Sequence, residues 1–200
     1  MANRTWHVTG GFITYVIILL WLYYANSFIF QVTDIAWLIE ALFLALFGAE
    51  FPDLDKLEIF EGHIDHRDWF FHSSIIVTII TATMIWTHPS YNVLLPLMGF
   101  FSMGLGSHLL LDLFPTYKKS DTPLGKIKSL ILWFISGLSG DAKDPYHFGG
   151  TYTIHFSFVM IGKKSISVRA TRLWLFINSL ISIFMGAILI QTFIYTRTVL

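Results

Sequence analysis

The sequence contains no cysteine and few charged residues. Without cysteine, disulfide bonds and thiolate metal sites are excluded, so a metal ion would have to be held by His, Asp, Glu, carbonyl oxygen or water. Charged residues make up 13% of the 200 residues, against roughly 25% in soluble domains. Hydrophobic residues make up 54% and aromatic residues 17%. Most of the chain is therefore expected to face lipid or another helix.

The chain shows no sign of division into domains. Because neither a Gly/Ser/Pro-rich linker nor a block of like charges interrupts it, we interpret residues 1–200 as a single integral membrane domain. The net charge is zero, which gives no general attraction to nucleic acid, and no nucleic-acid partner is expected. The first apolar run has no small-residue cleavage site after it, which indicates a retained span rather than a signal peptide.

Several apolar segments are long enough, or nearly so, to cross a bilayer, which requires about 20 mostly apolar residues. Spans are expected at about residues 11–32, 35–51, 69–86, 91–114 and 173–195. The stretch 130–138 is too short to cross, and residues 140–168 are expected to form a short hairpin or an irregular loop. We therefore predict an all-α polytopic membrane bundle of about five transmembrane helices.

Positive charge is concentrated on one side of the predicted bundle. Counting the crossings from the N-terminus places twelve of the 13 Lys and Arg residues at one face and Arg197 at the other. The twelve are Arg4, Lys56, Arg67, Lys118, Lys119, Lys126, Lys128, Lys143, Lys163, Lys164, Arg169 and Arg172. Because such an excess marks the cytoplasmic side, we predict a protein of the cytoplasmic membrane with its N-terminus inside and its C-terminus outside.

Residues of metal-ligand type gather at the cytoplasmic ends of the predicted spans. They are His7, Asp53, Asp55, His66, His72, His108 and Asp112. Because His108 and Asp112 are four residues apart, a helix brings both side chains to one face. In an extended segment, Asp53 and Asp55 would aim the same way, as a carboxylate pair that bridges two cations requires. The joint pattern predicts a metal site formed by several spans.

Each of these residues also has a purely structural interpretation. His7 could be an interfacial residue, and Asp53 and Asp55 could be helix-capping or solvated loop carboxylates. A structural His-Asp pair would explain His108 and Asp112 less easily, because an Asp inside an apolar helix costs about 2.5 to 3.5 kcal/mol and is functional by default.

Three polar residues beside the ligands are candidates for catalysis. Glu50 ends an apolar segment three residues before Asp53 and could be a ligand, a general base or a solvated helix end. Arg67 could hold a phosphate beside the metals or extend to the interface. The predicted catalytic residues are Glu50, Asp55 and Arg67.

Taken in order, these residues resemble a known family. The motifs His7-Val-Thr-Gly, Pro52-Asp53-Leu54-Asp55, His66-Arg67 followed by His72-Ser73, and His108-Leu-Leu-Leu-Asp112 are similar to those of YdjM-type membrane-bound metal-dependent hydrolases, over about residues 5–125. The order of ligands is also remotely similar to that of zinc-dependent phospholipase C. The chain departs from the family pattern at Glu50, Asp68 and Phe71. The resemblance implies a metal-dependent hydrolase without naming its substrate.

The leading functional hypothesis is a membrane-embedded hydrolase that cleaves a phosphoester of a lipid or lipid-linked substrate at the cytoplasmic face. Two zinc ions, or manganese, would lower the pKa of bound water from 15.7 towards about 7. Membrane lipid is the expected partner, and the basic residues would hold an anionic substrate. A metal-ion or proton-coupled transporter, and a non-catalytic membrane scaffold with a residual metal site, are the alternatives.

Overall fold

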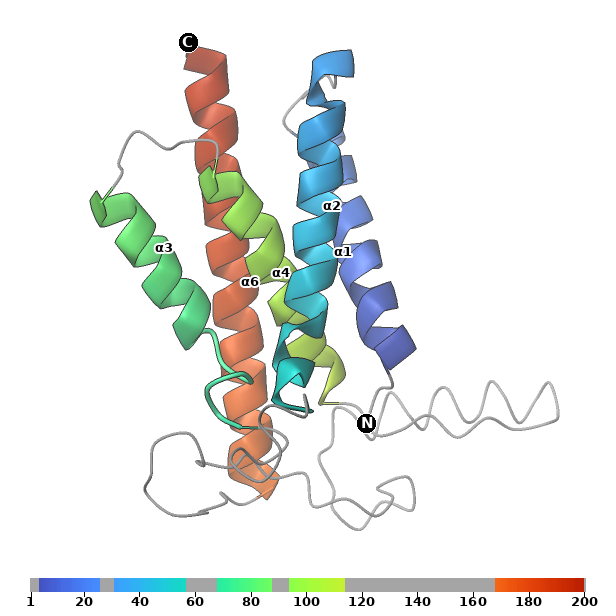
Figure 1. Ribbon diagram of the computed structural model, residues 1–200, viewed down its shortest axis with the longest axis vertical. Helices are drawn as coiled ribbons and strands as arrows, with labels where there is room; N and C mark the ends of the chain where they lie inside the picture. Colours follow the sequence, from blue (N-terminus) through green and yellow to red (C-terminus); the bar gives the residue numbers. More distant parts are fainter. Residues whose placement is uncertain (1–3, 26–30, 57–67, 88–93, 114–167, 200) are drawn as a thin grey trace, which may run out of the picture.

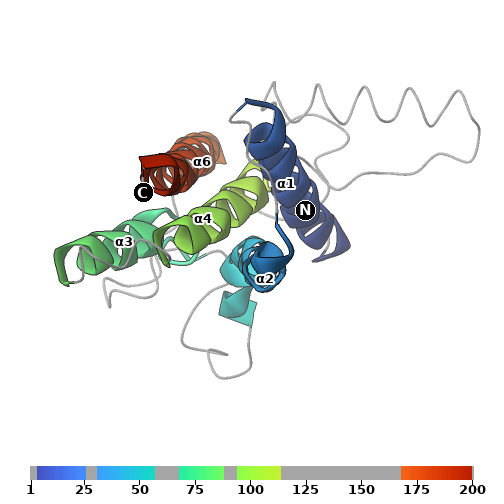
Figure 2. The same ribbon diagram turned by 90° about the horizontal axis from the view of Figure 1, so that it is seen from above.

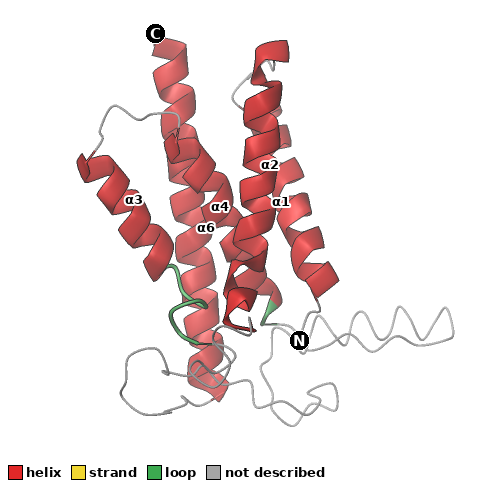
Figure 3. Cartoon of the chain, in the orientation of Figure 1, coloured by secondary structure: helices red, strands yellow, loops and turns green. Residues whose placement is uncertain are grey.

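Helices make up almost all of the described chain. The computed structural model describes residues 4–25, 31–56, 68–87, 94–113 and 168–199. Its elements are α1 (Arg4–Ala25), η1 (Val32–Asp34), α2 (Ile35–Glu50), η2 (Phe51–Lys56), α3 (Ile75–Thr87), α4 (Leu94–Leu111) and α6 (Val168–Val199), where η denotes a 3-10 helix. Figure 3 shows these helices, with the turn before α3 in green. The predicted all-α membrane bundle is confirmed, whereas the segment expected at 140–168 lies outside the described residues except for Val168, where α6 begins.

Four of the described helices are long and apolar enough to cross a membrane. The spans are Thr5–Tyr24, Ile35–Leu54, Leu94–Leu111 and Ala170–Gln191. The helix α3 is apolar but has only 13 residues, about 20 Å at 1.5 Å per residue, against about 30 Å for the hydrocarbon core of a bilayer. It begins later than the predicted span at 69–86, because hydrogen bonds to Asp68 fold the preceding residues into a turn.

The first helix begins earlier than the sequence predicts. The expected span started near residue 11, but α1 begins at Arg4 and ends at Ala25. Its first turns pack closely against the other helices, because a Cβ on Gly10 or Gly11 would meet the side chains of Leu111 or Ala49. The early start places His7 inside the helix rather than in front of it.

The helix α4 lies at the centre of the bundle. In Figure 1, α2 and α4 run downward, whereas α1, α3 and α6 run upward. Seen from above in Figure 2, α4 has α1 and α2 on one side and α3 and α6 on the other. Its side chains are correspondingly buried, with Phe100, Leu105 and Leu109 fully inaccessible. A helix surrounded by others in this way is expected to be apolar on all sides.

Small residues allow α4 to approach both of its main neighbours. A Cβ added to Gly104 would clash with the carbonyl oxygen of Ala45 on α2, and one added to Gly48 would clash with that of Phe101 on α4. Towards α6, a Cβ on Gly99 would lie 2.9 Å from the carbonyl oxygen of Gly186. Small residues at helix contacts are typical of membrane bundles, where close backbone packing contributes to association.

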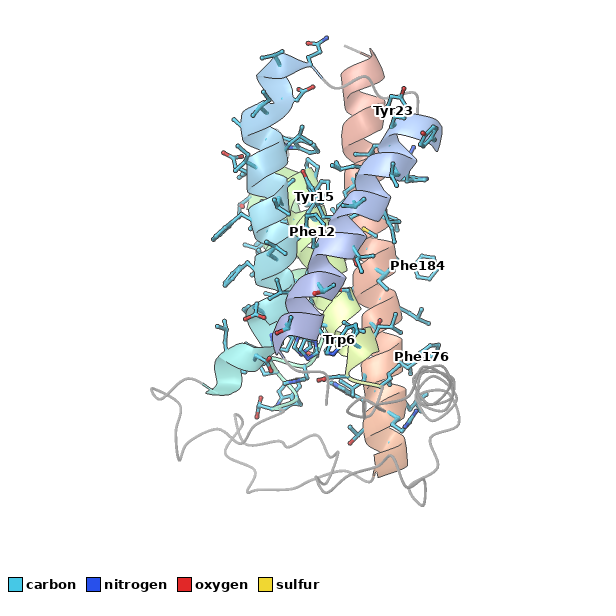
Figure 4. The ribbon with its side chains drawn as sticks, turned by 90° about the vertical axis from the view of Figure 1, so that its right-hand side faces the viewer. Trp6, Phe12, Tyr15, Tyr23, Phe176 and Phe184 are labelled. Atoms are coloured by element: carbon cyan, nitrogen blue, oxygen red, sulfur yellow. The ribbon has the colours of Figure 1, made fainter. Side chains whose placement is uncertain are left out.

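Large apolar side chains cover the outer surface. Figure 4 shows Phe176 and Phe184 projecting away from α6, whereas Tyr15 points between the helices. The exposed fraction is 45% for Phe176 and 66% for Phe184. Buried Tyr15 satisfies its hydroxyl group by donating to the carbonyl oxygen of Leu38 at 3.0 Å. An apolar exterior with polar groups paired inside suits a lipid environment.

Candidate metal centre

Four buried ionisable side chains meet near the C-terminal end of α4. His7 comes from α1, His72 from the turn before α3, His108 from the last turn of α4, and Asp112 from the residue after that helix. None is more than 3% exposed. Buried groups of this kind are stable only when they pair with one another or with an ion. The helical spacing that brings His108 and Asp112 together is the one expected from the sequence.

The carboxylate of Asp112 lies between the three imidazoles. Its Oδ1 is 3.6 Å from His7 Nε2, and its Oδ2 is 3.6 Å from both His72 Nε2 and His108 Nε2. These separations are longer than an ordinary hydrogen bond. Two ligands about 2.1 Å from one tetrahedral ion are about 3.4 Å apart. The spacing therefore fits ligands arranged around a metal ion.

Main-chain carbonyl groups determine which imidazole nitrogen faces the centre. His108 Nδ1 lies 2.6 Å from the carbonyl oxygen of Ala49, and His72 Nδ1 lies 3.2 Å from that of Asp68. Because a carbonyl oxygen can only accept, these hydrogen bonds require a proton on each Nδ1, and in the neutral form of each ring the lone pair is then on Nε2. Metal-binding histidines commonly donate their second nitrogen to a carbonyl or carboxylate in this way.

The ring of His7 stacks on that of His108. The ring centroids are 3.6 Å apart and the planes differ by 14°. Two imidazolium cations at this distance would repel each other strongly in a buried environment. The stacked pair therefore requires at least one neutral ring, which is the form that binds metal.

Asp53 adds a second group of possible ligands. One group comprises His72, His108 and Asp112, and the other comprises His7, Asp53 and His108; within each, the ligand atoms all lie within 4.8 Å of one another. Both groups contain His108. All three members of the first group are buried, whereas Asp53 in the second is only partly buried. The described residues thus offer two adjoining groups that could hold a metal ion.

Five of the seven predicted ligands come together: His7, Asp53, His72, His108 and Asp112. The structure does not test the two remaining ligand predictions, His66 and Asp55. His66 and Arg67 lie outside the described residues, as does the side chain of Asp55. The predicted catalytic residue Glu50 ends α2 and is partly buried, and it belongs to neither group.

The local structure predicted for the two aspartates is wrong. Residues Phe51–Lys56 form the 3-10 helix η2, not an extended strand. Pro52 is the second residue of this 3-10 helix, which follows α2 without a break. At about three residues per turn, side chains two positions apart point about 120° away from each other. The alternation of an extended segment, on which the predicted carboxylate pair depended, is therefore absent from Phe51–Lys56.

The sequence-based interpretation missed a polar network that holds the turn carrying His72. Trp174 Nε1 on α6 donates to the carbonyl oxygen of His72 at 2.9 Å. The side-chain oxygen of Asn178 accepts from both the amide and the hydroxyl of Ser74, each at 2.9 Å. Asp68 shapes the same turn, since its carboxylate accepts from the amide of Phe70 at 2.9 Å. Asn178, a buried amide in a mostly apolar span, is a signal in the sequence that could have pointed to this network.

Replacing Trp174 with Phe should weaken metal binding while the fold is kept. The change removes the donor to His72 O, at a cost of about 1 kcal/mol in stability. Loss of a partner that orients a ligand reduces metal affinity about tenfold to a hundredfold. Zinc titration of the purified protein measures the effect. The control is Trp86→Phe, at a position 86% exposed on α3; equal affinities in the two variants would contradict the positioning role.

The fold and the buried cluster together define a multi-pass membrane protein with candidate metal-binding groups among its helices. More specifically, the chain belongs to the YdjM inner membrane protein family, whose model matches residues 1–195. The family resemblance seen in the motifs is thereby confirmed and extends into the C-terminal part of the chain. Comparisons with curated proteins and with solved structures found no match, so the likeness to phospholipase C has no support.

Proposed function

We propose that this protein is a membrane-embedded, metal-dependent hydrolase that cleaves a phosphoester of a lipid or lipid-linked substrate. The observation that carries the proposal is the convergence of His7, His72 and His108 on the carboxylate of Asp112, with 3.6 Å between each Nε2 and a carboxylate oxygen. A divalent ion, with zinc as the first candidate and manganese as the second, would supply Lewis-acid activation of the phosphoryl group and of water.

The protein's own residues would orient the metal ligands and limit the access of water to the ion. The hydrogen bonds from His108 to Ala49 and from His72 to Asp68 hold both rings with Nε2 towards the centre. A fixed donor set of this kind needs little reorganisation during reaction. Glu50, Asp55 and Arg67 remain the proposed general base, additional ligand and phosphate-binding residue.

Aromatic side chains beside the centre support a lipid substrate. Phe47 on α2 is 41% exposed, and its ring lies 6.1 Å from that of Phe51, which lies 5.7 Å from that of Phe71. Phe71 immediately precedes His72 in the turn. This row of rings connects the lipid-facing surface with the ligands, and it offers apolar contact area to an acyl chain.

The charge distribution supports a site on the cytoplasmic side. Twelve of the 13 Lys and Arg residues belong to the segments at the end of the bundle that carries the histidines, by the count of crossings made from the sequence. Near an anionic membrane surface, each contributes about 1 kcal/mol of attraction to an acidic lipid. The proposed orientation has the N-terminus in the cytoplasm and the C-terminus outside.

The test is hydrolysis by purified protein of a panel of phosphomonoesters and phosphodiesters that includes phospholipids in vesicles. Chelator should abolish turnover and zinc should restore it. His108→Ala should reduce the rate at least about a hundredfold, since even outer residues of a metal site matter at that level. Glu40→Gln, an exposed position in the middle of α2, should keep full activity.

Two results would contradict the proposal. One is full activity in His108→Ala, and the other is the absence of turnover across the panel in protein shown to contain metal. Metal flux into vesicles without hydrolysis would favour transport instead. Bound metal with neither activity would favour a scaffold.

A further inference from the structure

The two candidate metal groups cannot be filled through the same histidine. Both contain His108, and its Nδ1 donates to the carbonyl oxygen of Ala49 at 2.6 Å. A neutral imidazole with a protonated Nδ1 has one remaining lone pair, on Nε2. His108 can therefore bind one ion at a time while that hydrogen bond is kept, and one of the groups must do without it.

The geometry assigns His108 to the group that contains His72 and Asp112, which we call the inner group. The group that contains His7 and Asp53 is the outer group. Its Nε2 and that of His72 are both 3.6 Å from the same oxygen, Asp112 Oδ2. The other oxygen, Oδ1, lies 3.6 Å from His7 Nε2. The carboxylate of Asp112 is thus placed to bridge, with one oxygen towards an inner ion and one towards an outer ion. Paired ions bridged in this way are a known arrangement in phosphoester hydrolysis.

The two positions have three ligands each, but the ligands differ in burial and in how firmly they are oriented. The inner position has His72, His108 and an Asp112 oxygen, all buried, with both rings oriented by main-chain carbonyls. Once His108 serves the inner ion, the outer position keeps His7 and partly buried Asp53. Asp112 Oδ1, 3.6 Å from His7 Nε2, would then take the place of His108 as its third ligand. Buried, oriented ligands favour tight binding, whereas a site with a partly buried ligand exchanges its ion more readily and admits water or substrate oxygen.

We propose that this centre binds two ions in sequence, a tightly held inner ion on His72, His108 and Asp112, and a weaker, exchangeable outer ion on His7, Asp53 and Asp112. The inference rests on the proposed metal-dependent function and adds a form of regulation. At low free metal the protein would carry the inner ion alone. Activity would then follow the free concentration of divalent metal through the outer position.

The test is a titration of metal-free protein with zinc by calorimetry, and with cobalt by visible absorption, in the wild type and in Asp53→Asn. Two steps are expected in the wild type, with affinities at least about tenfold apart. Asp53→Asn should keep the first step and weaken the second by at least about a hundredfold. Glu40→Gln, the equivalent loss of a carboxylate elsewhere on the α2 span, should leave both steps unchanged.

Some outcomes would overturn the proposal. They are a single equivalent of bound metal, two equivalents of equal affinity, and loss of the tighter step in Asp53→Asn. Because these readouts need no substrate, they are independent of the hydrolysis assay. A protein with two distinct metal steps and no turnover would refute the proposed enzyme while leaving the sequential binding intact.

Discussion

Replacing Asp112 with Asn should remove metal from both positions, with a loss of affinity of at least about a hundredfold at each. The substitution keeps the size of the side chain but removes the charge that faces three imidazoles at 3.6 Å. Of the described ligands, this carboxylate has an oxygen towards each group, so it cannot be replaced by a neighbour. Metal content after dialysis, measured by elemental analysis, gives the result directly.

The matched control for that change is Asp34→Asn. Asp34 is also buried, at 8% exposure, but it lies at the opposite end of α2, where its carboxylate accepts from the amide of Gln31 at 2.8 Å. Its replacement should affect helix capping and leave metal content unchanged. If Asp112→Asn keeps its zinc, or if both variants lose zinc equally, the central position assigned to Asp112 is wrong.

Replacing Gly104 with Ala should disturb both the bundle and the metal centre. The added Cβ would clash with the carbonyl oxygen of Ala45, and it would lie 3.1 Å from the amide nitrogen of Ala49. Because the obstacle is backbone, the helices must separate, and the expected loss of stability is about 3 kcal/mol. Separation would also draw the carbonyl of Ala49 away from His108 Nδ1 and lower zinc affinity.

Thermal unfolding in detergent and zinc titration together measure this coupling. The control is Ala187→Gly, a change of the same single methyl group at a partly buried position on α6, which should cost about 1 kcal/mol through helix propensity alone. A Gly104→Ala protein with unchanged melting temperature and zinc affinity would show that the close approach of α2 and α4 is not required.

The parts of the fold that follow from local pattern were predictable from the sequence. Runs of apolar residues indicate spans wherever the chain must satisfy its backbone hydrogen bonds in lipid, and the four-residue spacing of His108 and Asp112 gives a shared helix face. The clustering of His7 and Asp53 with His108 also agrees with the prediction. The local structures differ from those predicted, because His7 lies inside α1 and Asp53 lies in a 3-10 helix.

The errors arose where contacts distant in sequence determine the backbone. The start of α1 depends on packing of Gly10 and Gly11 against other helices. The turn before α3 has local hydrogen bonds to Asp68, but it is also held by Trp174, 102 residues beyond His72. The spacing of apolar residues along the chain does not reveal such distant partners. The predicted third span therefore begins at residue 69, whereas α3 begins at Ile75. The roles of His66, Arg67 and Asp55 remain predictions.

The hydrogen bond from Trp174 to His72 links the last described helix to a ligand from the middle of the chain. During synthesis, α6 emerges after every ligand of the centre has been made. The turn carrying His72 acquires its anchor only when this helix has inserted. The candidate metal centre is therefore expected to be complete only after α6 has inserted.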